Sequence, residues 1–318
     1  MTLDEIYEEI KKSNSFVILT HENPDGDAIG SVCSMGLMLK NMGKTDVDIY
    51  LKEYPKLYEF VPGIEMITSE PKEKKYDMAI AVDCANLDRV SKVYRHFFEN
   101  TDIKVQIDHH NKNTMFGDYN IVNPVSPSCT QILASSFDYL GIEITKDIAS
   151  CIVTGIITDT YGFSSPETTT ESFEFAAMAL SKGVNVAKIY NNALRKISKT
   201  RFEIESLAKE RLEFLEDGKI AYTYMTKADE AKIGAQTGDM DSIVEFGRNI
   251  EGVEVSIFIY EKENCFKASI RSNEYVDASS ICLAFGGGGH VKAAGANLQM
   301  TLEEAKETII NETKKYLK

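Results

Sequence analysis

The chain has 318 residues, of which 43% are hydrophobic and 26% charged, as in a folded globular protein long enough to form two domains. Its net charge of −14 argues against binding of long duplex DNA, because such binding needs basic residues that displace counterions from phosphates. A small anionic substrate is compatible with this charge, since bound divalent cations reverse the local sign of a carboxylate site.

Nothing in the sequence indicates a membrane or an oxidising compartment. No apolar stretch approaches the roughly 20 residues of a membrane span. The acidic, amphipathic start of the chain lacks the features of a signal peptide. The 6 cysteines are scattered without a C-x-x-C pair, which indicates reduced thiols and not a zinc site. We therefore expect a cytoplasmic protein that does not contact membranes.

In the first half of the chain, short apolar runs alternate with helical patterns. The runs predict strands at residues 16–20, 47–51, 78–82 and 103–107. A helix is expected from Ala28 to Asn41, closed by Gly43. Strands and helices that alternate in this way indicate β-α-β units and a mostly parallel sheet.

The second half begins with helices and ends with a different pattern. Apolar spacing predicts helices at residues 130–139, 148–157 and 172–180, and a charged run without proline or glycine predicts further helices at 185–211. Strands are expected at 220–225, 253–260 and 266–271, before a helix at 301–317 that Thr301 caps. The fold class is therefore α/β: a mostly parallel sheet flanked by helices in residues 1–185, a helical linker at 186–214, and a smaller α+β domain at 215–318.

Three of the predicted strands end in ionisable residues. The strand at 16–20 is followed by His21, Asp25 and Asp27. The strand at 78–82 is followed by Asp83, and the strand at 103–107 by Asp108-His109-His110. Ligands of open α/β sheets bind at the carboxyl ends of the strands. We therefore expect these side chains in one site.

The first cluster has the pattern H-x-x-x-D-x-D, in which Pro24 and Gly26 hold a tight loop. Its two carboxylates, Asp25 and Asp27, repel each other unless a cation neutralises them, and imidazole with carboxylate suits Mn²⁺. The alternative is a solvated turn in which Asp27 caps the following helix.

Taken one at a time, the other acidic and histidine residues fit a surface position as well as a metal site. Taken together, they favour a metal site. Asp83 alone fits a helix cap or a surface turn, but beside the first cluster it is a candidate carboxylate bridging two metals. Of His109 and His110, one is expected to bind metal and the other phosphate, the alternative being polar surface. Asp159 ends an apolar helix, where an acidic residue is unfavourable unless a cation compensates.

A glycine run in the last part of the chain, Gly286-Gly287-Gly288-Gly289-His290, lies between apolar residues. Four glycines cost backbone entropy, and binding of a ligand phosphate by their N–H groups would explain them better than a flexible linker. Arg271, at the end of a predicted strand, could clamp a phosphate, although a surface salt bridge is the usual role of such an arginine.

These stretches resemble the DHH phosphoesterase superfamily. Its four motifs are matched by residues 19–31, Val82-Asp83, Asp108-His109-His110 and Thr158-Asp159-Thr160. Its DHH-associated C-terminal domain is matched by Arg271-Ser272-Asn273, Phe285 and the glycine run. The resemblance covers almost the whole chain and favours the nanoRNase and pAp-phosphatase branch over RecJ exonucleases and type II pyrophosphatases. Many members carry lysine at the position of Asn273.

The resemblance implies a role for each matched residue. Two Mn²⁺ ions are expected, with Mg²⁺ or Co²⁺ as alternatives. His21, Asp25 and Asp83 would hold one ion. The second would be held by Asp27, Asp83, His109 and Asp159. Two residues would be catalytic: His110 would contact the substrate phosphate, and Asp108 would orient the histidines. The substrate would be bound by Arg271, Ser272 and the Gly286–His290 loop.

The implied activity is hydrolysis of short single-stranded RNA to 5′-mononucleotides and of pAp (3′-phosphoadenosine 5′-phosphate) to AMP. The nearest alternative is a phosphodiesterase for cyclic di-AMP or pApA. A non-catalytic, metal-dependent nucleotide-binding regulator is the alternative from another class, and a pyrophosphatase is disfavoured by the glycine loop. The sequence leaves the polarity of degradation and the oligomeric state open.

Overall fold

The computed structural model describes residues 2–235, 240 and 243–318. The chain forms two compact units, Met1–Lys196 and Ile197–Lys318. The predicted linker, residues 186–214, extends across the division between them. Within the described part of the chain, no helix is both long and apolar enough to cross a membrane.

The first unit contains a six-stranded sheet in the order β3-β2-β1-β4-β5-β6, with every neighbouring pair parallel. Its strands are β1 (Ser15–Leu19), β2 (Asp46–Tyr50), β3 (Ile67–Thr68), β4 (Met78–Val82), β5 (Ile103–Asp108) and β6 (Tyr119–Val122). The chain leaves β1 towards β2 and β3 and then returns to the other side of β1 as β4. The β1–β4 junction is therefore the point where strand order reverses, and such a point is a usual place for a ligand.

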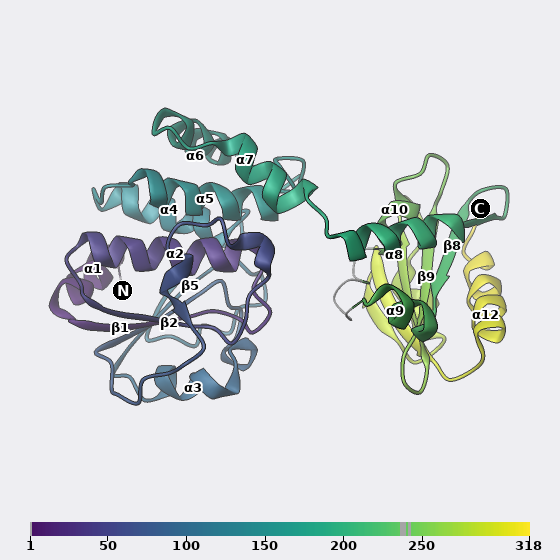
Figure 1. The fold of residues 1–318 in the computed structure, drawn as a ribbon, viewed down its shortest axis with the longest axis horizontal. Coiled ribbons are helices and arrows are strands. Elements are labelled where there is room, and N and C mark those ends of the chain that lie inside the picture. Colours follow the sequence, from purple (N-terminus) through teal and green to yellow (C-terminus); the bar gives the residue numbers. More distant parts are fainter. Residues whose placement is uncertain (1, 236–239, 241–242) are drawn as a thin grey trace. The chain divides into compact units, whose positions relative to one another are not determined.

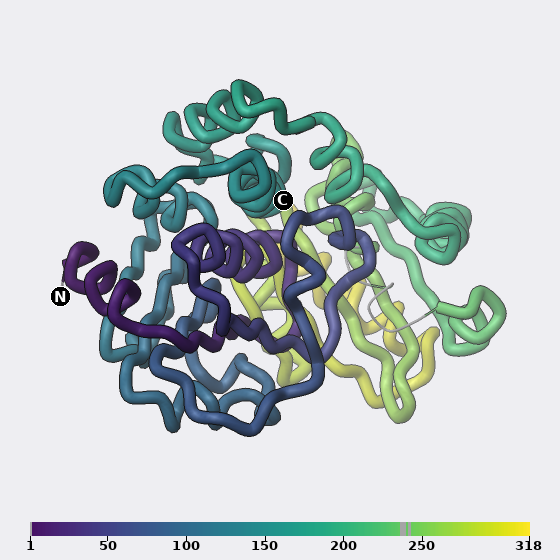
Figure 2. Tube along the Cα trace, turned by 60° about the vertical axis from the view of Figure 1, so that its left-hand side comes forward, coloured from purple at the N-terminus to yellow at the C-terminus, as the bar shows by residue number. Residues whose placement is uncertain are grey.

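Helices cover both faces of this sheet (Figure 1). They are α1 (Leu3–Lys12), α2 (Gly26–Asn41), α3 (Lys92–Glu99), α4 (Cys129–Tyr139), α5 (Lys146–Asp159), α6 (Thr170–Ser181) and α7 (Val186–Tyr190), with a π-helical turn at Asn191–Arg195. Helices α2 and α4 contact the sheet directly, α5 packs on both of them, and α6 packs on α5 (Figures 1 and 2). Helix α3 contacts β1 and β4 on the other face.

The continuous apolar strands follow from burial on both faces. In β1, Phe16 and Ile18 face the core that includes α2 and α5, whereas Val17 and Leu19 face the core around α3. A strand of a parallel sheet that is covered on both sides needs no polar alternation. This is why β1, β4 and β5 are found within a residue of their predicted bounds.

The second unit holds a mixed six-stranded sheet in the order β11-β12-β10-β9-β8-β7, in which only β8 and β9 pair in parallel. Its strands are β7 (Glu213–Leu215), β8 (Ile220–Met225), β9 (Val255–Glu261), β10 (Phe266–Ser272), β11 (Gly288–His290) and β12 (Ala293–Leu298). Its described helices are α8 (Lys199–Glu210), α9 (Lys227–Ile233), α10 (Ile243–Arg248), α11 (Ala278–Leu283) and α12 (Leu302–Lys314).

Two apolar cores lie on the two faces of this second sheet. Side chains of α8 and α10 pack on one face and those of α11 and α12 on the other. Thr301 caps α12 as predicted: its hydroxyl accepts from the backbone N–H of Glu304, and the Glu304 carboxylate accepts from the N–H of Thr301. The predicted helix was too long at its C-terminus, because α12 ends at Lys314.

Candidate metal and phosphate site

The acidic and histidine residues expected in the site meet at the carboxyl edge of the first sheet. The loops after β1 and β4, the end of β5, the first turn of α2 and the last turn of α5 supply them. Three groups of side chains have ligand atoms that all lie within 4.8 Å of one another: His21, Asp25 and Asp83; Asp27, His109 and Asp159; Asp83, His109 and His110. All six residues predicted to bind metal are therefore together.

Asp83 lies at the centre of the cluster. Its φ of +50° places it in the left-handed region, a conformation that tends to occur at functional sites. Its Oδ2 is 3.5 Å from His21 Nε2, and its Oδ1 is 3.5 Å from His109 Nε2. Although Oδ1 is buried, it accepts no hydrogen bond from the described residues. Burial raises the pKa of Asp83, but the two imidazoles outweigh burial and lower it.

Asp27 is fully buried and held by the start of α4. Its carboxylate accepts hydrogen bonds from the N–H groups of Cys129 (2.6 Å) and Thr130 (2.9 Å), and from the Thr130 hydroxyl (2.8 Å). Burial, followed by the charge of Asp83, raises the pKa of Asp27 to about 7. The carboxylate is thus fixed in place but is costly to ionise without a cation.

Asp25 caps α2, so the alternative in which Asp27 is the cap is wrong. Asp25 Oδ1 accepts from the N–H groups of Asp27 (3.1 Å) and Ala28 (3.0 Å). The helix accordingly begins at Gly26, two residues before the predicted start, and Gly43 follows its end with a φ of +82°. The capping bonds fix Asp25 beside His21 and Asp83.

Asp159 and His109 complete the cluster. Burial, followed by the charge of Asp27, raises the pKa of Asp159 to about 10. His109 Nδ1 donates to the Ser126 carbonyl at 3.3 Å, so that Nε2, 3.4 Å from Asp159 Oδ2, faces the carboxylates. Burial lowers the pKa of His109, but Asp83, Asp27 and Asp159 together raise it to about 10.

The donor set fits a divalent metal. Buried carboxylates repel one another here, and one buried oxygen of Asp83 has no donor among the described residues. A cation would remove both costs. Carboxylate oxygens mixed with imidazole nitrogens suit Mn²⁺ and related ions.

His110 is oriented by Asp108, as expected. His110 Nδ1 donates to Asp108 Oδ1 at 2.7 Å, a bond that raises the pKa of His110, and Asn113 donates to Asp108 Oδ2 at 2.5 Å. Asp108 forms no such bond with His109, which Ser126 orients instead. Sequence reasoning missed Asn113, and it also missed Arg89, whose Nη1 lies 3.4 Å from His110 Nε2. Asn113 lies outside the helices and strands and Arg89 ends a short 3₁₀ helix, and no pattern in the sequence marked either of them.

The predicted substrate-binding residues of the second unit have partners of their own. Arg271, on β10, donates from Nε to Glu245 at 2.7 Å. Buried Ser272 donates to the Val276 carbonyl at 2.7 Å. Asn273, where many family members have lysine, donates to the carbonyls of Arg248 (2.8 Å) and Val253 (2.7 Å). A role on the substrate stays a prediction for Arg271 and Ser272.

Backbone packing explains part of the glycine run. The run leads into β11, an edge strand in which His290 is exposed. A Cβ on Gly287 would lie 2.3 Å from the Gly295 carbonyl oxygen, and one on Gly289 would lie 2.4 Å from that of Ala293. Gly286 has a φ of +69°, whereas a Cβ on Gly288 would meet open space. A phosphate ligand is therefore not needed to explain Gly286, Gly287 and Gly289, and only Gly288 lacks a structural reason.

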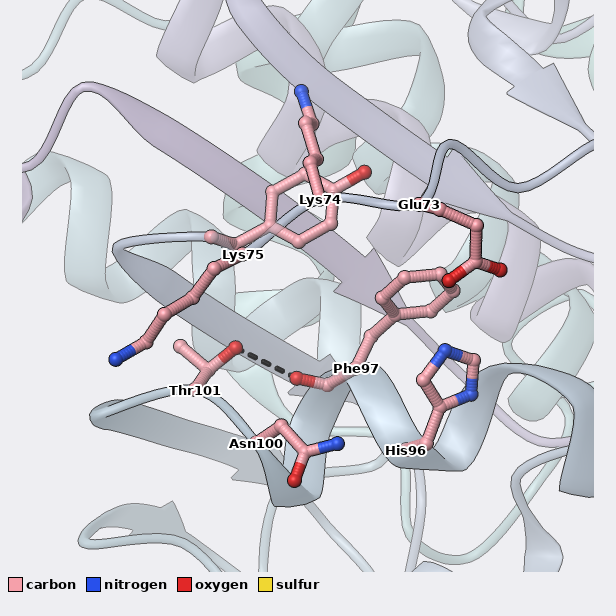
Figure 3. A pocket seen from close by; sticks show the side chains of 8 residues that line it. Glu73, Lys74, Lys75, His96, Phe97, Asn100 and Thr101 are labelled. Carbon is pink, nitrogen blue, oxygen red and sulfur yellow. Dashed lines mark hydrogen bonds between the residues drawn. The ribbon is translucent and has the colours of Figure 1, made fainter.

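A pocket of about 390 Å³ lies at the opposite, amino edge of the first sheet, beside Tyr76 and Thr101 (Figure 3). Its lysines are already neutralised: Lys74 pairs with Asp46 and Asp48, and Lys75 with Asp102. This pocket lacks the free charges that an anionic ligand needs. The carboxyl edge is therefore the better candidate site.

Comparisons with known proteins agree with this arrangement. The description "DHH family, N-terminal domain" matches residues 15–156, and "DHHA1 domain" matches 217–318. The bifunctional oligoribonuclease and PAP phosphatase of Thermus thermophilus is 34% identical over 94% of this chain and 89% of its own length. The cyclic-di-AMP phosphodiesterase of Listeria monocytogenes is 24% identical over 98% of this chain but 49% of that protein.

Solved structures share the fold. An exopolyphosphatase-related protein from Bacteroides fragilis superposes with a TM-score of 0.86 at 25% identity, covering 99% of this chain and 96% of that one. The exonuclease RecJ bound to manganese superposes with a TM-score of 0.55 at 13% identity, covering 99% of this chain and 94% of that chain. The second likeness shows the fold alone.

Proposed function

Because the chain belongs to the DHH family, we propose that it is a metal-dependent phosphoesterase that hydrolyses short oligoribonucleotides to 5′-mononucleotides and pAp to AMP. The observation that carries this proposal is the set of six ligand residues gathered around Asp83. The relative from Thermus thermophilus, named for both activities, supports the choice of substrates.

The cofactor that this site fits best is a pair of Mn²⁺ ions. His21, Asp25 and Asp83 would hold one of them. Asp27, Asp83, His109 and Asp159 would hold the second. When bound, such a pair supplies a hydroxide at neutral pH and neutralises charge that develops on the phosphate.

The protein's own groups orient the reaction. Asp25 accepts hydrogen bonds from N–H groups at the start of α2, and Asp27 accepts them from N–H groups at the start of α4, so two carboxylates are fixed before any ion binds. Asp108 and Asn113 fix the ring of His110, which is proposed to contact a phosphate oxygen. Preorganised groups of this kind do not have to be reoriented as charge develops in the reaction.

The second unit is proposed to bind the nucleotide through Arg271, Ser272 and the Gly286–His290 loop. A cavity of about 370 Å³ beside that loop is lined by Lys267, Phe285 and glycines 286–288. The N–H groups of Gly286 and Gly287 already donate to the carbonyls of Leu283 and Cys282, so the ammonium group of Lys267 is the donor proposed to bind a phosphate there. The ion pair with Glu245 leaves Arg271 with guanidinium N–H groups for a further contact.

Loss of Asp83 tests the proposal. Asp83→Asn keeps the shape of the side chain but removes the charge that both proposed ligand sets share, so we expect Mn²⁺-dependent release of AMP from pAp and from a dinucleotide to fall at least 100-fold. Product chromatography measures this. The matched control is Asp102→Asn, an exposed carboxylate paired with Lys75 at the opposite edge, which should keep normal rates. Near-normal turnover of Asp83→Asn would contradict the proposal.

Cyclic di-AMP and pApA are the second candidate substrates, because the Listeria monocytogenes phosphodiesterase aligns with nearly the whole chain. Rates of the wild-type protein on pAp, a dinucleotide, pApA and cyclic di-AMP decide between them. If Mn²⁺ binds but no substrate of this panel is cleaved, the catalytic proposal is wrong and the alternative of a nucleotide-binding regulator is favoured.

A further inference from the structure

Arg89 is a cation beside the acidic site, and no carboxylate of the described residues forms an ion pair with it. It ends the short 3₁₀ helix Leu87–Arg89, six residues after Asp83 in the loop that leaves β4. Among residues 2–235, 240 and 243–318, no carboxylate oxygen lies within 4.0 Å of its guanidinium nitrogens. The arginines at 95, 211, 248 and 271, by contrast, each pair with a carboxylate.

The backbone of Arg89 is fixed between two loops of the site. Its carbonyl accepts a hydrogen bond from the Glu22 N–H at 2.8 Å, and its own N–H donates to the Asn86 carbonyl at 3.2 Å. Glu22 lies between the proposed ligands His21 and Asp25. The position of Arg89 is therefore tied to both the β1 loop and the β4 loop.

The side chain of Arg89 points to the phosphate-contacting histidine. Its Nη1 is 3.4 Å from His110 Nε2, while His110 Nδ1 is committed to Asp108 at 2.7 Å. A separation of 3.4 Å is longer than a good N–H···N bond, so this contact orients the guanidinium without satisfying it. Arginine has five N–H donors, and within the described part of the chain the contact with His110 is the one hydrogen-bonding contact of the Arg89 side chain.

From this geometry we propose that Arg89 binds a non-bridging oxygen of the substrate phosphate, next to the oxygen contacted by His110. Arginine suits this role because its planar fork matches a phosphate group and stays charged. The ligand class is a phosphate mono- or diester on a short nucleotide. This inference rests on the proposed function and adds to it a binding residue in the first unit.

The test compares Arg89→Gln, Arg89→Lys and the control Lys92→Gln in the Mn²⁺-loaded, full-length protein. Lys92 is an exposed cation three residues away, and its loss changes the net charge equally. Loss of a charge-assisted hydrogen bond predicts that Arg89→Gln lowers kcat/KM on an adenosine dinucleotide, whose attacked phosphate stays on the released AMP, roughly 10- to 100-fold. AMP affinity, measured by calorimetry, should fall by a similar factor. Arg89→Lys should recover part of both losses, and Lys92→Gln should match the wild type.

Mn²⁺ affinity and melting temperature distinguish the loss of a phosphate contact from damage to the metal site or to the fold. Both should be unchanged in Arg89→Gln, and the weak binding of adenosine, which has no phosphate, should be unchanged as well. Normal kcat/KM and AMP affinity in Arg89→Gln would overturn the inference. A parallel loss of Mn²⁺ affinity would also overturn it, because Arg89 would then support the loops instead of the substrate.

A double variant, Arg89→Gln with His110→Asn, tests whether the two residues contact one phosphate. Effects on AMP affinity that are less than additive support the inference, whereas fully additive effects contradict a shared phosphate. If the wild-type protein cleaves no substrate, the proposed function fails. The AMP affinities then still decide whether Arg89 binds phosphate.

Discussion

Gly155 allows the two carboxylates of α2 and α5 to share one site. A Cβ at this position would lie 2.3 Å from Asp27 Oδ1 and 2.2 Å from the Thr130 hydroxyl oxygen. Gly30 similarly permits close contact, since its Cβ would lie 2.6 Å from the Cys151 carbonyl oxygen. Because Gly30 and Gly155 have no side chain, α2 and α5 pack closely enough to bring Asp27 near Asp159. The absence of a Cβ at Gly155 also leaves room for the hydrogen bond from the Thr130 hydroxyl to Asp27.

Gly155→Ala is therefore expected to damage the site more than the fold. The added methyl must displace Asp27 or Thr130, at a cost of about 1–3 kcal/mol that the better helix propensity of alanine partly offsets. Mn²⁺ affinity should fall at least tenfold, measured by calorimetry, with melting followed by circular dichroism. Ser150→Ala, on a less buried part of α5, is the control and should change neither quantity. Unchanged Mn²⁺ affinity in Gly155→Ala would show that the close packing is not needed.

At the scale of the element, burial explains which features the sequence could predict. Strands covered on both faces are continuous apolar runs, and β4 was predicted with its observed bounds. The edge strand β6 was missed because its four residues are only half-buried, and β11 because glycines carry no strand pattern. Ligand residues at strand ends could be predicted from motif and position. Arg89 could not, because contacts between segments that are distant in the sequence, such as the hydrogen bond from the Glu22 N–H to the Arg89 carbonyl, place it beside the site.

A bidentate ion pair joins the end of α8 to α9. Arg211, which follows α8, donates from Nη1 and Nη2 to the two oxygens of Asp229 at 2.6 and 2.9 Å. The hydrogen bonds from Arg211, more than any other cause, lower the pKa of Asp229 to about 2. Because this pKa is lowered from 3.8, the pair stabilises the fold above about pH 4 and loses its effect as the pH falls towards 2.

Asp229→Asn should consequently lower the free energy of unfolding by about 1 kcal/mol at pH 7, a value reduced for partial exposure of the pair. The difference from the wild type should shrink between pH 4 and pH 2, as followed by urea titration at several pH values. Glu230→Gln on the same helix removes a charge without an ion pair and serves as control. A difference that stays constant down to pH 2 would mean that ionisation of Asp229 is not the cause.

At the scale of the whole molecule, the two units are proposed to carry different kinds of chemistry. All proposed metal ligands come from residues 21–159 of the first unit. The second unit contributes the proposed nucleotide contacts other than those of His110 and Arg89 with the phosphate, and the chain as a whole has a net charge of −14. An acidic protein of this kind repels long polyanions, so binding should depend on a few local cations. This arrangement predicts that metal binding and nucleotide binding can be lost separately.

Arg271→Gln tests that separation. If Arg271 binds the nucleotide as proposed, the variant should lower kcat/KM on pAp roughly 10- to 100-fold, the effect of one lost charge-assisted hydrogen bond, and leave Mn²⁺ affinity unchanged. Arg248→Gln is a close control, because Arg248 pairs at 3.0 Å with the same carboxylate, Glu245, that Arg271 contacts at 2.7 Å. Equal losses in both variants would mean that unpairing Glu245 causes the defect. A loss confined to Arg271→Gln, with normal Mn²⁺ binding, would assign Arg271 to the substrate.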